Sequence, residues 1–265
     1  MNLFWREMRA NRKSLLIWCI GMIAMMAASM GKYAGYSSST GSINDLVAQM
    51  PKALQVMFNL NYFDLSKVSG YYGMLFIYLL LMTTIHASLL GGTIITKEEE
   101  DKTAEFLFVK PVSRAMILTS KLAAAIVNIV ILNLVTFFSS IVFIAPYRNG
   151  EVVNGDIAKL MIGMLLIQLL FVSIGASAAV FSKHPKYASS LSTGILLVTF
   201  LLSRAIEINS KLEFLQYVTP FKYFEAKTLM YGGTFQPVFL ALTCIIIGIL
   251  GITMYSVYQK KDLLV

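Results

Sequence analysis

The stretch Tyr72–Thr96, YGMLFIYLLLMTTIHASLLGGTIIT, decides the fold class of this chain. It contains no Asp, Glu, Lys or Arg, and it is longer than the about 20 residues that a helix needs to cross a bilayer. Lipid offers the backbone no hydrogen bonds, so a spanning segment must be a helix or part of a closed barrel. Because the stretch is continuously apolar rather than alternating, we predict a transmembrane helix.

The composition of the whole chain indicates a membrane protein. Of its 265 residues, 57% are hydrophobic and 14% are charged, whereas about 25% of residues are charged in an average soluble domain. These values exclude a disordered chain and an ordinary soluble domain, which would need more charge to cover its surface. The net charge of +8 would suggest nucleic acid in a soluble protein. Here we attribute it to basic residues on one side of a bilayer, and we expect no nucleic acid partner.

Five further apolar runs have similar character, so we predict an all-α, polytopic membrane protein with six transmembrane helices. We expect one membrane domain that covers residues 1–265. The fifth run is the shortest and ends at Arg204, whose side chain can snorkel to the interface. The six predicted spans are about Ser14–Tyr33, Tyr72–Thr96, Leu122–Pro146, Ile157–Phe181, Ser189–Ile206 and Pro237–Val257.

The basic residues predict how the spans are oriented. With the N-terminus inside, thirteen of the 22 Lys and Arg residues fall on inner segments. Most of the others lie in two longer outer loops, where the positive-inside rule carries less weight. We therefore expect a multi-pass protein of the cell membrane with both termini in the cytoplasm.

The N-terminal segment, residues 1–13, is expected to form an amphipathic helix at the inner membrane surface. It combines apolar side chains such as Trp5 with Arg6, Arg9 and Arg12, which gives an apolar face and a basic face at helical spacing. The alternative is a basic flank that only anchors the first span.

The two longer outer loops also contain patterned sequence. In the loop Ala34–Ser69, an amphipathic helix is possible around Ile43–Phe58, and Pro51 would limit or kink it. The loop Glu207–Gln236 is dense in aromatic residues, which is typical of segments at the membrane interface.

A few polar side chains within the spans are candidates for a substrate path. They are His86, Asn128, Asn133 and Gln168. Hydrogen bonding between helices is the simpler interpretation of the amides, and a neutral histidine at a helix contact is the simpler interpretation of His86. A substrate path or proton relay is the alternative, because ionisable groups inside a membrane tend to face a bundle interior or water. The six cores lack carboxylates, which argues against a proton- or sodium-coupled carrier.

Motifs for catalysis and metal binding are absent from the sequence. It has no G-x-x-x-x-G-K-[ST] phosphate loop, no H-E-x-x-H zinc motif and no G-x-S-x-G nucleophile motif. We therefore expect no catalytic residue, no metal site and no cofactor in this chain.

The most informative loop is Lys97–Arg114, KEEEDKTAEFLFVKPVSR, between the second and third spans. Acidic residues open it and favour a helix N-terminus, and apolar residues such as Leu107 follow. Pro111 would end that helix, and Ser113 could cap the next. We predict a short helix, a break and a helix that enters the third span. Such an element suits docking in a groove of a soluble partner, and a solvated linker is the alternative.

The spacing E-x-E-x-x-T-x-E-x-L-x-x-x-P-x-S-R in this loop resembles the first cytoplasmic loop of ABC-2 type transporter permeases, the membrane subunits of ABC transporters. Family members usually have Gly where Lys102 stands. The matching residues are Glu98, Glu100, Thr103, Glu105, Leu107, Pro111, Ser113 and Arg114.

The resemblance implies that the loop is a coupling helix on a separate ATP-binding subunit, which would hold ATP and Mg. Glu98, Glu100, Thr103 and Glu105 would dock, and the residues from Pro111 to Arg114 would set the angle of the third span. Family permeases work in pairs, so a second copy or a homologous permease is implied. Export is favoured over uptake by analogy.

Three other functions stay open at this point. The first is a secondary carrier or channel that works without ATP. The second is a membrane-embedded enzyme using Glu98, Glu99 and His86, although roughly 15 Å of helix would separate the glutamates from the histidine. The third is an interaction protein that sequesters a partner at the membrane.

Overall fold

The structure is a computed structural model that describes residues 3–37, 43–100, 113–182 and 185–260. Within these ranges it is helical and contains no strand, which confirms the predicted fold class. Six helices are long and apolar enough to cross a membrane, and each matches one of the six predicted spans, although the third predicted span runs two residues past the end of its helix, into η1 (Ala145–Tyr147). They are α1 (Leu3–Ser37), α4 (Val68–Glu100), α6 (Arg114–Ile144), α7 (Asn154–Phe181), α8 (Pro185–Ile208) and α10 (Pro237–Lys260).

Shorter helices cover the connections. The predicted helix around Ile43–Phe58 is divided at Pro51 into two pieces, as its sequence indicated. The short elements are α2 (Ile43–Ala48), α3 (Lys52–Met57), η1 (Ala145–Tyr147), η2 (Ser210–Val218), η3 (Pro220–Lys222) and α9 (Ala226–Leu229).

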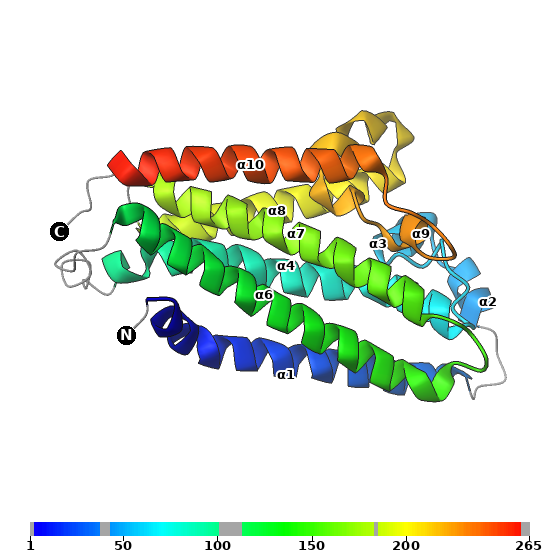
Figure 1. Ribbon diagram of the computed structural model, residues 1–265. Coiled ribbons are helices and arrows are strands. Elements are labelled where there is room, and N and C mark those ends of the chain that lie inside the picture. Colours follow the sequence, from blue (N-terminus) through cyan, green and yellow to red (C-terminus); the bar gives the residue numbers. More distant parts are fainter. Residues whose placement is uncertain (1–2, 38–42, 101–112, 183–184, 261–265) are drawn as a thin grey trace.

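The six long helices run side by side as one bundle (Figure 1). The start of α1, the start of α6 and the end of α10 share one end of the bundle, which we call the inner end after the predicted orientation. The helices α2, α3 and α9 lie at the opposite, outer end. Helices α4 and α7 are largely buried between their neighbours, whereas α1, α8 and α10 expose long apolar faces such as Ile245, Ile249 and Ile252.

The central contact of the bundle is the crossing of α4 and α7. At Gly91 a Cβ atom would lie 2.4 Å from the carbonyl oxygen of Val172, and at Gly175 it would lie 2.5 Å from that of Ser88. Both distances are far below van der Waals contact, so only glycine lets the two backbones approach this closely. Small residues at helix crossings serve the same purpose in membrane proteins generally.

The predicted N-terminal amphipathic segment is helical, but it is not a separate element. It is continuous with the first span in α1, and Figure 1 shows its first turns at an angle to the rest of that helix. Glu7 is buried, while Trp5, Arg9 and Arg12 are exposed. Asn128 of α6 donates a hydrogen bond to the sulfur of Met8 (3.3 Å). One face of the segment therefore packs on the bundle, and its contact with a membrane surface stays a prediction.

Candidate functional site

The loop between the second and third spans begins later than predicted. Helix α4 continues through Lys97 to Glu100, so the backbone of Glu98 and Glu100 forms its last turn rather than the first turn of a new helix. Nothing between Thr96 and Glu100 breaks a helix, and Lys and Glu are good helix formers, so the second span extends beyond its apolar stretch. The remaining predicted residues of this loop lie outside the described residues. They are Thr103, Glu105 and Leu107 of the predicted docking segment, and Pro111, the predicted helix break.

The far side of the loop is described from Ser113 onward and agrees with the prediction. Ser113 is the N-cap of α6, and its hydroxyl oxygen accepts a hydrogen bond from the backbone N–H of Met116 at 3.2 Å. Arg114 donates from Nη1 to the backbone oxygen of Gln259 at 3.1 Å. A cation at the end of α10 also suits the negative end of the helix dipole. The first turn of α6 is thereby tied to the last turn of α10.

Replacing Ser113 by alanine should destabilise the start of α6 by about 1 kcal/mol, because the Met116 amide loses its capping partner. Hydrogen exchange of the Met116 amide in detergent-solubilised protein would measure this, and we expect faster exchange. Ser256→Ala is the matched control, because the Ser256 hydroxyl bonds to the carbonyl oxygen of Thr253 within its own helix and caps no helix start. Equal protection of Met116 in both variants would contradict the capping role.

A buried lysine joins the two helices that flank the loop. Lys121, on α6, is fully buried, and its Nζ donates to the backbone oxygen of Ile94 near the end of α4. A buried ammonium group is costly unless it is hydrogen-bonded. The inner ends of α4 and α6 are therefore held together by a specific polar contact.

The residues predicted for a substrate path do not form one site. Asn133 of α6 donates to Oε1 of Gln168 on α7 (3.2 Å) and to the backbone oxygen of Met161 (3.1 Å). Asn128 instead bonds to Ala124 of its own helix (2.7 Å) and to Met8. His86 faces α1, where its ring centroid lies 5.4 Å from that of Trp18. These contacts favour hydrogen bonding and packing between helices, and a role in transport stays a proposal.

The outer end of the bundle contains a charged cluster that the sequence did not reveal. We call it the outer ion cluster, and it brings together residues from the end of α8 and from the segment between α8 and α10. Its members are Arg204, Glu207, Lys222, Glu225 and Lys227.

Glu207 is the centre of this cluster. Its Oε1 atom accepts hydrogen bonds from Nζ of Lys222 and from Nζ of Lys227 (2.6 Å). Its other oxygen accepts one from the hydroxyl of Tyr62, in the segment between α3 and α4. The Glu207 side chain is only 4% exposed. One carboxylate therefore links the segment before α4, the end of α8 and the segment that follows α8.

Glu225 is the second carboxylate of the cluster. It pairs with Lys222 at 2.7 Å, with Lys227 at 3.3 Å and with Arg204 at 3.8 Å. Arg204 is 7% exposed, because this carboxylate on a neighbouring segment gives its guanidinium a partner inside the fold. Whether the side chain also reaches the membrane interface stays a prediction.

The cluster sets the charge state of its most exposed cation. Burial lowers the pKa of Lys227, but the carboxylates of Glu225 and Glu207 outweigh it and hold the pKa above its ordinary value. The Lys227 ammonium also lies 4.3 Å from the ring centroid of Tyr62, which favours the charged form further. Lys227 is thus positively charged at any physiological pH.

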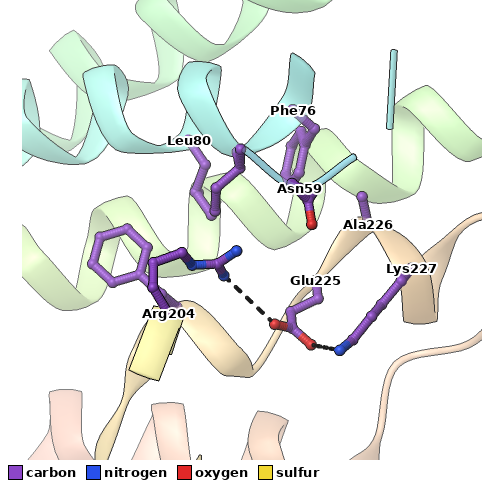
Figure 2. Close-up of a pocket in the computed structure, with 9 residues that line it drawn as sticks. Asn59, Phe76, Leu80, Arg204, Glu225, Ala226 and Lys227 are labelled. Atoms are coloured by element: carbon purple, nitrogen blue, oxygen red, sulfur yellow. Dashed lines mark ion pairs between the residues drawn. The ribbon is translucent and has the colours of Figure 1, made fainter. Parts of the chain in front are cut away.

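Two spaces lie on either side of the cluster. A cleft of about 350 Å³ is lined by polar residues that include Glu207, Glu213 and Lys222. A much smaller cavity of about 10 Å³ lies deeper, against Phe76 and Leu80 of α4, and is shown in Figure 2. Glu225 and Lys227 line both spaces.

The fold and these sites together define a polytopic membrane protein with six candidate spans and, at its outer end, a buried charged cluster. A family model described as ABC-2 family transporter protein matches residues 1–263, and the chain belongs to this family. It is thus a multi-pass membrane subunit, or permease, of an ABC transporter. Members of this family are transport subunits rather than catalytic enzymes. A search of curated proteins finds no match to the chain.

Proposed function

We propose that the chain is the permease of an ATP-driven exporter of the cell membrane, with both termini in the cytoplasm, and that it is driven through residues 97–114 by a separate ATP-binding subunit. That subunit would hold ATP and Mg, and two permease chains would act together. The observation that supports the proposal is the anchoring of this segment at both sides. On one side α4 continues to Glu100, and on the other Ser113 caps α6.

The anchoring matters because a docked loop transmits force only if its ends are attached to rigid elements. Arg114 ties the start of α6 to the end of α10, and Lys121 ties α6 to α4. A displacement of residues 97–114 by the ATP-binding subunit would thus move three spans at once. Glu98, Glu100, Thr103 and Glu105 are the proposed docking residues, and the sequence from Pro111 to Arg114 would set the angle between loop and span.

Reversing one docking charge tests this proposal. Glu105→Lys should lower substrate-stimulated ATPase activity of the complex about tenfold or more, because a like charge at an interface costs several kcal/mol. Membrane insertion of the permease should be unchanged. The measurement uses the permease together with the ATP-binding subunit that co-purifies with it, reconstituted in vesicles.

Glu99→Lys is the matched control, since it makes the same charge change at a position outside the E-x-E-x-x-T-x-E spacing. Unchanged coupling in the Glu105→Lys complex would contradict the docking role. Failure of any phosphate-loop ATPase to co-purify from native membranes would contradict the proposed function itself and would favour a carrier or channel that works without ATP.

A further inference from the structure

The two spaces at the outer end share one ion pair in their linings, Glu225 with Lys227 at 3.3 Å, and we call this pair the wall between them. Glu225 and Lys227 line the cleft on one side and the small cavity on the other. The cavity side reaches Phe76 and Leu80, which belong to the span α4 and are each 2% exposed. The wall therefore stands between the outer cleft and the interior of the bundle.

The contacts in this wall are unequal in strength. On the cleft side, Lys222 donates to Glu225 at 2.7 Å. Towards the cavity, the closest approach of Arg204 to Glu225 is 3.8 Å, which exceeds hydrogen-bond length, and Figure 2 shows the guanidinium pointing at the carboxylate across this gap. A cavity of about 10 Å³ has room for about one water. A single water bridging the two groups would complete the arrangement.

The two partners in the wall differ in their access to solvent. Lys227 is 28% exposed, so water can compete for its ammonium group, whereas the Glu225 side chain is only 11% exposed. The remaining contacts, from Tyr62 and Lys222 to Glu207, would hold the segment in place while Lys227 moved. Glu207, which we call the hub of the cluster, is thus buried, whereas Lys227 is partly exposed to solvent.

We propose that Glu225 and Lys227 position an outer gate of the transport route, and that separating them joins the cleft to the space between α4 and α8 at Leu80. The cleft carries carboxylates, ammonium groups and neutral polar side chains, so the joined route would admit water and hydrated polar solutes from outside. The gate rests on the proposed transport function for its purpose, but its opening is a property of the permease alone.

A single-cysteine reporter tests the gate. Leu80→Cys would be made in a chain whose own cysteines are replaced, Cys19→Ala and Cys244→Ala, and exposed to a membrane-impermeant methanethiosulfonate reagent. With the cluster intact the reporter should react slowly. Adding Lys227→Met should raise the labelling rate about two- to fivefold, because the closed state then loses one ion pair of modest free energy relative to the open state.

Two further variants serve as controls. Lys227→Arg keeps the charge and should leave the labelling slow. Lys211→Met removes an exposed lysine on the neighbouring η2 that does not line the cleft, and it should also leave the rate unchanged. If Lys227→Met does not elute as a single folded species, Glu225→Gln replaces it with the same expectation.

The outcomes separate a gate from a merely structural contact. Lower thermal stability without faster labelling would overturn the proposal, and so would an equal rise in Lys211→Met. In the complex with an ATP-binding subunit, ATP should raise labelling of the reporter while the cluster is intact. If Lys227→Met opens the isolated permease but ATP has no effect, the gate stands and the proposed ATP coupling is contradicted.

Discussion

Replacing Gly91 by alanine is expected to disrupt the packing of α4 on α7 and to destabilise the protein by about 3 kcal/mol. The added Cβ would lie 2.4 Å from the carbonyl oxygen of Val172 and 3.0 Å from its Cα. Both are backbone atoms of a long helix, so no side chain can rotate to relieve the overlap. The two helices would have to move apart, and the contacts along their whole crossing would loosen.

The same argument applies from the other helix. A Cβ at Gly175 would lie 2.5 Å from the oxygen of Ser88 and 2.9 Å from the backbone nitrogen of Gly92. Since bundle interiors are close-packed, an overlap at this central crossing is not absorbed locally. Gly175→Ala should therefore have an effect similar to that of Gly91→Ala.

Thermal unfolding of the detergent-solubilised chain would measure both effects. After each heating step, the fraction that still elutes as a single folded species would report how much protein remains folded. Gly248→Ala is the matched control: Gly248 lies on α10, and a Cβ there would meet nothing within 4 Å. We expect the control to melt at the same temperature as the unsubstituted chain or slightly higher, because alanine is the better helix former. A Gly91→Ala variant that also melts unchanged would show that the close crossing of α4 and α7 is not a feature of the folded protein.

The spans were predictable because their signal is local. A continuous apolar run in lipid leaves the backbone one efficient solution, and each of the six runs matches a long helix. The ends were less predictable, since hydropathy reports where lipid ends rather than where the helix ends. Helix α4 continues to Glu100 and α1 starts at Leu3, because the flanking polar residues are themselves compatible with a helix.

The same distinction applies to the functional residues. The Ser113 cap was predictable, because its partner is the amide three residues later. The outer ion cluster was not, since Glu207 is joined to Tyr62, which is 145 residues away. The one local signal was the spacing of Lys222 and Glu225, which are three residues apart. Nothing in the sequence indicated that they also meet Glu207.

Removing the hub of the cluster is the second change with a large expected effect. Glu207→Ala should destabilise the protein by about 3–5 kcal/mol, the cost of leaving buried charges without a partner. Lys222 is 8% exposed and would keep only Glu225, while Lys227 and the hydroxyl of Tyr62 would each lose a hydrogen bond. The end of α8 would then lose its contact with the segment before α4, through Tyr62, and its contacts with Lys222 and Lys227.

Thermal unfolding of Glu207→Ala beside Glu213→Ala measures this effect with a matched control. Glu213 is a carboxylate on the same cleft, but it is exposed, so its loss should change stability by no more than about 0.5 kcal/mol. Equal melting of the two variants would contradict the role of Glu207 as hub. Adding Lys222→Ala to Glu207→Ala should cost less than Lys222→Ala alone, because the lysine no longer has its main partner to lose. A fully additive double variant would mean that the two charges are stabilised independently, and that the cluster does not act as one unit.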